Sequence, residues 1–332
     1  MNKVKKANWF FFAVVCVYLG GSLLFGLLSR KVELPYNLLV MTGQILIGGT
    51  LIVHSVITKG SLLKQIRHER LGIIDILLVA LIMFLCLPLV YFINYVSMMF
   101  TENEIAGTMS DMVSNPYIVN LAMIALTPAI VEELVCRGVL YHSYKTKNTI
   151  FAIVMSAFIF GLLHMNLNQM LYAMALGIVF CLVVEATGSI YSSMIMHFIM
   201  NSISTTMLAL LKLLMKSGLY SEEMLDAELA AGMQNAATLE TPPVLTVILI
   251  VIGILIVVAF GACAVLLMGY LAKRRGHYEE FRAIFKKDKN KTTVTLEDIA
   301  ADKERKGTVA VIKEYGVLVI TIIICILAMI FL

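Results

Sequence analysis

Long apolar runs separated by short polar segments make up most of the chain. Each run is close to the roughly 20 residues that a helix needs to cross the hydrocarbon core of a bilayer. The pattern predicts an all-α, polytopic transmembrane helix bundle of about nine spans, at approximately 9–28, 36–57, 72–99, 117–143, 149–166, 168–186, 189–214, 243–271 and 316–332. The third and eighth runs are longer than the bilayer requires, so we expect those helices to tilt or to project.

The composition supports a membrane protein and excludes several soluble classes. Hydrophobic residues make up 60% of the 332 residues and charged residues only 14%. The net charge of +4 is small, and the basic residues lie in loops between the runs. We therefore expect no nucleic-acid partner, and we expect the lipid bilayer to be the main surrounding of the protein.

The distribution of charged residues in the loops predicts the orientation. Basic residues follow the second, fourth and eighth runs, at 59–70, 145–147 and 273–275, whereas the connections at 101–116 and 215–242 are mainly acidic. Positive residues favour the cytoplasmic side, which predicts a cytoplasmic N-terminus and an external C-terminus. Arg30 and Lys31 are the exception to this pattern. We expect a multi-pass protein of the plasma membrane of a bacterium.

The same pattern divides the chain into five regions. We expect N-terminal transmembrane helices at 1–116, a catalytic core of four helices at 117–214, and an external acidic loop with the eighth span at 215–271. A basic cytoplasmic linker at 272–315 and a C-terminal transmembrane helix at 316–332 follow. The front half of the linker can lie against anionic headgroups, and 296–315 can form a short polar helix. A simple solvated linker is the alternative.

Three charged residues lie inside the fourth apolar run. Each charged group costs about 2.5–3.5 kcal/mol at the centre of a membrane helix on insertion scales, so such residues normally face protein or water. Glu133 and Arg137 are four residues apart and share a helix face, where they can neutralise each other. Glu132 points about 100° away and has no partner at that spacing. We therefore predict that Glu132 is the catalytic carboxylate and that Glu133 and Arg137 brace it. The alternative is an ion pair that only fixes helix packing.

Two further runs carry histidines. His164 follows Phe160 by one turn on the fifth run, and His197 precedes Asn201 by one turn on the seventh. Asn201 can hold the His197 imidazole in one tautomer, or it can donate its amide to a developing oxyanion. The depths of these residues along their spans allow them to meet near the middle of the bilayer, in a cavity that we expect to be reached from the cytoplasm.

Three short motifs resemble those of the CPBP family, which comprises intramembrane CAAX-type proteases and bacteriocin-processing or self-immunity proteins. They are Glu-Glu-x-x-x-Arg at 132–137, Phe-x-x-x-His at 160–164 and His-x-x-x-Asn at 197–201. The resemblance covers roughly 117–203. It implies an α-helical endopeptidase in which Glu132 and His164 activate a water, while His197 and Asn201 stabilise the tetrahedral oxyanion.

The sequence leaves several questions open. Glu132, His164 and His197 would make a two-histidine, one-carboxylate zinc set, but no HExxH helix is present and a glutamate–histidine pair can activate water without a metal. The expected substrate is a peptide or a membrane-proximal protein. A non-enzymatic self-immunity or partner-binding protein is the first alternative, and a transporter with a proton relay is the second. The sequence does not indicate an oligomeric state.

Overall fold

The protein is helical throughout the part of the chain that the structure describes. The computed structural model describes residues 2–59, 64, 66–101, 115–219, 221, 223–224, 242–286 and 308–331. Within these ranges there is no strand, only an isolated bridge between His68 and Ser189. Eight helices in the described ranges are long and apolar enough to cross a membrane. The prediction of an all-α polytopic bundle is therefore confirmed.

The helices fall into three groups by length. Seven long helices are α1 (Lys3–Ser29), α2 (Tyr36–Ile57), α3 (Ile73–Ser97), α9 (Leu167–Thr187), α10 (Ile190–Lys216), α12 (Pro243–Arg275) and α15 (Thr308–Phe331). An eighth, continuous helix consists of α5 (Tyr117–Asn120), η3 (Leu121–Leu126), α6 (Thr127–Glu133), η4 (Leu134–Tyr141) and α7 (His142–Lys145). The shorter helices are α8 (Thr149–Leu162) and α13 (Tyr278–Phe285).

The prediction of nine full spans is wrong at the fifth position. The run at 149–166 forms α8, which ends at Leu162 and has only 14 residues. At 1.5 Å per residue it covers about 21 Å, which is less than the roughly 30 Å of the hydrocarbon core. The chain then turns through residues 163–166, where Met165 adopts a φ of 49°. The Asn166 side chain begins α9 by accepting a hydrogen bond from the Gln169 amide at 2.9 Å, as N-cap residues do.

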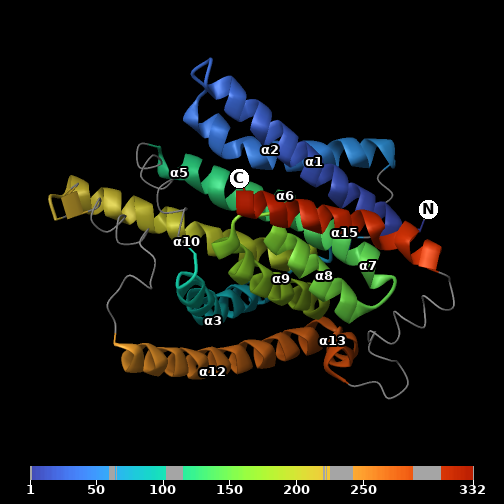
Figure 1. Cartoon of the computed structure of the whole chain (residues 1–332). Helices are drawn as coiled ribbons and strands as arrows, with labels where there is room; N and C mark the ends of the chain where they lie inside the picture. Colours follow the sequence, from blue (N-terminus) through green and yellow to red (C-terminus); the bar gives the residue numbers. More distant parts are fainter. Residues whose placement is uncertain are drawn as a thin grey trace.

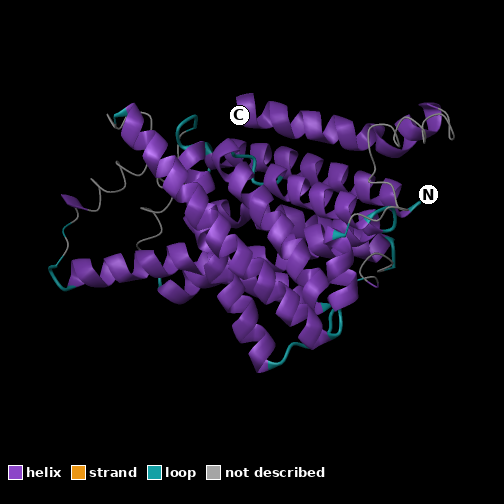
Figure 2. Ribbon diagram, turned by 90° about the horizontal axis from the view of Figure 1, so that it is seen from below, coloured by secondary structure: helices purple, strands orange, loops and turns teal. Residues whose placement is uncertain are grey.

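The hairpin of α8 and α9 lies at the centre of the bundle. Figure 1 shows these helices surrounded by α3, α10 and the helix that contains α6, with the α1–α2 hairpin on one side and α12 on the opposite side. Helix α15 packs along α1, and α12 packs on α3. The view in Figure 2 shows the same all-helical bundle turned by 90°. Large side chains of η4, α8 and α9, such as Tyr141, Phe160 and Phe180, are fully buried in this centre.

Close contact between α8 and α9 depends on Gly177. A Cβ atom at this position would lie 2.7 Å from the Ala157 Cα atom and 3.2 Å from Arg137 Nη2. Because the nearest atom belongs to backbone, the two helices would have to move apart to accept a methyl group. We expect Gly177→Ala to lower the free energy of unfolding by about 1–3 kcal/mol, measured by unfolding in detergent. Gly269→Ala on α12 is the control, because nothing lies within 4 Å of its added Cβ.

Several basic loop residues gather at one end of the bundle, which we call the basic end. Arg67 pairs with Glu280 at 2.8 Å, Lys145 pairs with Glu185, and Lys147 pairs with Glu314 at 3.1 Å. These pairs bring together the connections that follow α2, α7, α9 and α12 and the start of α15. The α8–α9 hairpin returns the chain to this end, so the short fifth helix does not change which loops lie together.

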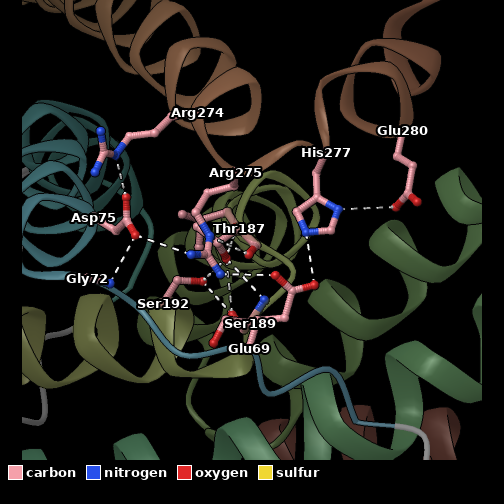
Figure 3. A network of polar contacts seen from close by, with 11 residues as sticks. Glu69, Gly72, Asp75, Thr187, Ser189, Ser192, Arg274, Arg275, His277 and Glu280 are labelled. Carbon is pink, nitrogen blue, oxygen red and sulfur yellow. Dashed lines mark hydrogen bonds and ion pairs between the residues drawn. The ribbon is translucent and has the colours of Figure 1, made fainter.

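The turn between α12 and α13 is fixed to the basic end by a polar network (Figure 3). Arg274 donates to Asp75 at 2.8 Å, while Arg275 donates to Glu69 at 3.0 Å and to the Thr187 carbonyl at 3.2 Å. These arginines are thus held in ion pairs within the protein. Nearby, burial acts to raise the pKa of Glu280, but the hydrogen bond and charge of Arg67 outweigh it and hold that pKa below its usual value.

The C-terminal region differs from the sequence-based expectation. Helix α15 begins at Thr308, eight residues before the predicted start of the last span. The predicted polar helix at 296–315 therefore falls partly on α15, and its remainder lies outside the described residues. Most of the predicted acidic loops at 101–116 and 215–242, and most of the predicted linker before 308, also lie outside the described residues.

Candidate active site

The three charged residues of the predicted site lie on a helix of mixed geometry. Glu132 and Glu133 end α6, and Arg137 lies in η4, one of two π-helical segments that flank α6. A π-helical segment leaves carbonyl groups that the α-helical ladder would normally satisfy, and such segments are frequent at functional sites. Here the Ser156 hydroxyl donates to the Cys136 carbonyl at 2.9 Å, and the His142 ring donates to the Arg137 carbonyl at 2.6 Å.

Glu133 is the centre of a buried polar cluster. Its Oε1 atom accepts from Arg137 Nη1 at 2.7 Å, so the predicted pair four residues apart is confirmed. The same oxygen lies 3.0 Å from His197 Nδ1. Both Glu133 and Arg137 have 0% of their side-chain surface exposed. The guanidinium lies over the rings of Phe160 and Phe180, at 4.2 and 5.0 Å from their centroids, where cation–π attraction stabilises it.

The contact with Glu133 fixes how His197 is presented. A carboxylate paired with arginine can only accept, so the Nδ1 atom of His197 must carry the donated hydrogen. The other ring nitrogen, Nε2, then points toward Glu132 and lies 3.9 Å from its Oε2 atom. The rings of Phe160 and Phe180 pack against the imidazole of His197, with centroid distances of 5.5 and 5.6 Å. The tautomer is therefore set by Glu133 rather than by the expected Asn201.

Glu132 has different neighbours from Glu133. Its Oε1 atom accepts a 2.6 Å hydrogen bond from Gln44 Nε2 on α2, a partner that the sequence-based reasoning missed. Its Oε2 atom is buried and has no hydrogen-bond partner among the described residues. The carboxylate lines a cavity of about 420 Å³. Glu132 is thus a buried carboxylate with one oxygen held and the other free beside an imidazole.

His164 lies past the end of its helix rather than on it. It belongs to the turn between α8 and α9, where its backbone amide donates to the Gly161 carbonyl at 3.2 Å. Its Nδ1 atom lies 2.8 Å from the Phe160 carbonyl oxygen. Because a carbonyl only accepts, Nδ1 carries the hydrogen and Nε2 keeps its lone pair in the neutral ring. The side chain lines the same cavity as Glu132.

Asn201 contacts the helix that carries Glu132 and Glu133. Its Nδ2 atom donates to the Ile124 carbonyl at 3.1 Å. In an α-helix that carbonyl would accept from residue 128, but Pro128 has no N–H. Asn201 therefore satisfies an acceptor in η3. An amide nitrogen has two hydrogens, so the second one stays available.

The cavity lies in the half of the bundle away from the basic end. It is bounded by α1 from Tyr18 to Gly26, by α2 from Leu39 to Ile47, and by Glu132, His164 and Gln169. These parts of α1 and α2 adjoin the α1–α2 connection, whereas α1 begins near the basic end, where Asn8 donates to the Glu314 carbonyl. The cavity therefore lies toward the α1–α2 connection rather than toward the basic end, and the expectation that it is reached from the cytoplasm stays a prediction.

The residues named for a zinc set do not form a ready-made metal site. No group of three His, Cys, Asp or Glu side chains is arranged to hold an ion within the described ranges. Glu132 and His197 approach each other at 3.9 Å, but Glu132 is also bonded to Gln44 and one nitrogen of each histidine is already engaged. The ring nitrogens and carboxylate oxygens thus bond to one another, to Gln44 and to the backbone.

Comparison with known families agrees with this geometry. Residues 114–203 match the family described as type II CAAX prenyl endopeptidase Rce1-like. These residues form a CPBP-family CAAX protease domain. All six predicted site residues lie inside the CAAX protease domain, whereas Gln44 and the α1–α2 walls of the cavity lie outside it. No curated protein and no solved structure matches the chain.

Proposed function

We propose that the protein is an intramembrane endopeptidase that hydrolyses a peptide bond of a peptide or membrane-associated protein. The observation that carries this proposal is the position of Glu132 on the wall of a cavity, with its free Oε2 atom 3.9 Å from His197 Nε2. A carboxylate that is held by one oxygen and free at the other can accept a proton from a water molecule. The CAAX protease family supports proteolysis as the reaction class.

In the proposed mechanism, Glu132 and His164 bind the attacking water. Glu132 takes one proton of the water, while the lone pair of His164 Nε2 holds the molecule in place. The water oxygen forms a bond with the carbonyl carbon of the substrate, and the carbonyl oxygen becomes an oxyanion. When the carbon–nitrogen bond breaks, the proton on Glu132 passes to the leaving amine and Glu132 is a carboxylate again. The product acid then gives its remaining proton to the amine, which leaves as an ammonium group.

His197 and Asn201 would stabilise the oxyanion. As an imidazolium with both ring nitrogens protonated, His197 presents Nε2–H toward the reacting centre while Nδ1–H donates to Glu133. Asn201 supplies its second amide hydrogen, since the first is bonded to Ile124. Donors fixed before the reaction stabilise developing charge effectively, because no reorganisation is needed. No step of this mechanism requires a metal ion.

The test uses the purified protein in lipid vesicles with two peptides of the same sequence, one with a farnesylated C-terminal CAAX motif and one without it. Mass spectrometry would detect a product that the wild-type protein forms and the Glu132→Gln variant does not. Comparing the peptides in membranes of cells that express either form would identify native substrates. Identical peptide profiles and no cleavage of either probe would contradict the proposal.

We also propose that the N-terminus and the basic end are cytoplasmic. The ion-paired loops of the basic end carry the excess of lysine and arginine that favours this side. The cavity would then lie in the outer half of the bilayer. Labelling single cysteines at Lys147 and Arg30 with a membrane-impermeant reagent tests this orientation, because only the second position would react in intact cells.

A further inference from the structure

Gln44 is the one residue outside the CAAX protease domain with a hydrogen bond to Glu132 in the described structure. Its Nε2 atom donates to Glu132 Oε1 at 2.6 Å, across 88 positions of sequence. Another polar side chain on the same helix and the same wall is bonded within α2. Thr42 donates to the Leu38 carbonyl of its own helix at 2.9 Å. The contact between Gln44 and Glu132 is thus specific to one side chain on α2.

The chemistry of the pair fixes the direction of the Gln44 amide. An ionised carboxylate only accepts hydrogen bonds, so the NH₂ group of Gln44 must face Glu132. The amide oxygen then faces away from the carboxylate. This Oε1 atom is buried and has no partner among the described residues, although Gln44 itself lines the cavity. A buried, unpaired acceptor beside a catalytic carboxylate is available to a donor that enters the cavity.

The position of Gln44 is also fixed by the packing of α2. Asn37, Gln44 and Gly48 recur at intervals of seven and four residues, which places them on one face of the helix. Asn37 Oδ1 accepts from Asn115 Nδ2 at 2.8 Å. A Cβ atom at Gly48 would lie 3.6 Å from Val131, an ordinary contact distance that shows α2 lying directly against α6. Contacts on both sides therefore hold Gln44 in register with Glu132.

The surroundings of the free oxygen fit a peptide main chain. An extended peptide carries an N–H donor at each residue other than proline, and a protease has to fix the scissile bond relative to its base. Two side-chain oxygens of this pair, Glu132 Oε2 and Gln44 Oε1, are buried and have no partner among the described residues. If Glu132 Oε2 receives the attacking water, Gln44 Oε1 is left for a donor of the substrate.

We propose that Gln44 orients Glu132 through its NH₂ group and binds a main-chain N–H of the substrate through its Oε1 atom. The inference rests on the proposed function. Gln44 lies on α2, outside the CAAX protease domain, and would contact both the base Glu132 and the substrate. The peptide to be cut would then lie along α2 at the level of Gln44.

Kinetics of two near-isosteric variants test both halves of this inference on a peptide that the wild-type protein cleaves. Gln44→Leu removes donor and acceptor, so we expect kcat to fall by about 10-fold to 100-fold and KM to rise by about 3-fold to 10-fold. Gln44→Glu restores an acceptor oxygen, but the new carboxyl group shares a proton with Glu132, so Glu132 is no longer a free base. Its KM should return toward the wild-type value while its kcat stays low, a split that a loss of packing would not produce.

Thr50→Val on the same helix is the matched control, because the Thr50 hydroxyl donates only to the Leu46 carbonyl at 2.8 Å. A kcat/KM of Gln44→Leu within twofold of this control would overturn the inference, and so would a fall in kcat without a rise in KM. Glu132→Gln separates the two levels of argument. If it is inactive while Gln44→Leu is fully active, only the role of Gln44 fails. If Glu132→Gln keeps full activity, the proposed function fails.

Discussion

The Glu132→Gln variant is expected to hydrolyse peptide about 10²-fold to 10⁴-fold more slowly than the wild-type protein. The amide keeps the size of the side chain, and its oxygen can still accept the hydrogen bond from Gln44. It cannot take a proton from water, so the loss should appear in kcat. The measurement is the rate of product formation with a validated peptide, in vesicles that contain equal amounts of folded protein.

The free energy of unfolding separates this effect from misfolding. We expect Glu132→Gln to unfold in detergent at nearly the wild-type temperature, because Glu132 has no ion pair with a lysine or arginine among the described residues. The Glu132→Asp variant is a useful companion, since it keeps the carboxylate but withdraws it from the cavity by one methylene. Wild-type kcat in the glutamine variant would contradict the role of Glu132 as the base and, with it, the proposed function.

Arg137→Met is expected to destabilise the protein by about 3–5 kcal/mol, the range found when one partner of a buried ion pair is removed. Glu133 would lose the guanidinium that lies 2.7 Å away, in a position with no exposed surface. The rings of Phe160 and Phe180 would also lose their cation. Unfolding of the purified protein in mixed detergent measures the change, and activity should fall because Glu133 also orients His197.

Two further variants show the cause of that loss. Arg137→Lys keeps the charge but not the planar group that fits between the aromatic rings, so we expect an intermediate stability. The double variant Glu133→Leu with Arg137→Met removes both charges and should recover part of the stability. It should not recover activity, because His197 loses its acceptor. A free energy of unfolding of Arg137→Met within about 1 kcal/mol of the wild-type value would show that the ion pair contributes little to stability.

The sequence predicted the helices well because their signal is strong and local. The boundaries of α2 agree with the predicted run, and the long apolar runs correspond to helices in the described ranges. The fifth run was predicted to continue to residue 166, whereas α8 ends at Leu162. The break before α9 was placed correctly to within a few residues, because polar residues follow in His164, Asn166 and Asn168. The predicted run failed only in its length, since Leu163 and Met165 in the turn are apolar.

The site was predictable only where its contacts are local. The spacing of Glu133 and Arg137 predicted their ion pair, which the structure contains. The contact of Gln44 with Glu132 depends on how two distant helices pack, and a single sequence does not encode that distance. One local signal was present, since Gln44 shares a helix face with Asn37 and Gly48 in an otherwise apolar run. The catalytic roles of the six site residues stay predictions.

The two π-helical segments were also beyond the sequence-based reasoning. Because Pro128 has no N–H, the Ile124 carbonyl lacks the backbone amide that it would accept from in an α-helix. The partner proved to be Asn201, which the resemblance had placed only at the oxyanion. Asn201 thus holds α10 to the helix that carries Glu132, so we expect its substitution to affect both this contact and the proposed oxyanion site.

The position of the cavity has a consequence for inhibition. Gly26 and Leu39 line it and are exposed on α1 and α2, two helices that we expect to meet acyl chains in a bilayer. A compound that dissolves in lipid would therefore be concentrated beside the cavity. A strongly hydrophilic compound would reach it less easily, because its transfer from water into the membrane is unfavourable. Potency should accordingly follow the amount of compound per lipid molecule rather than its concentration in the buffer.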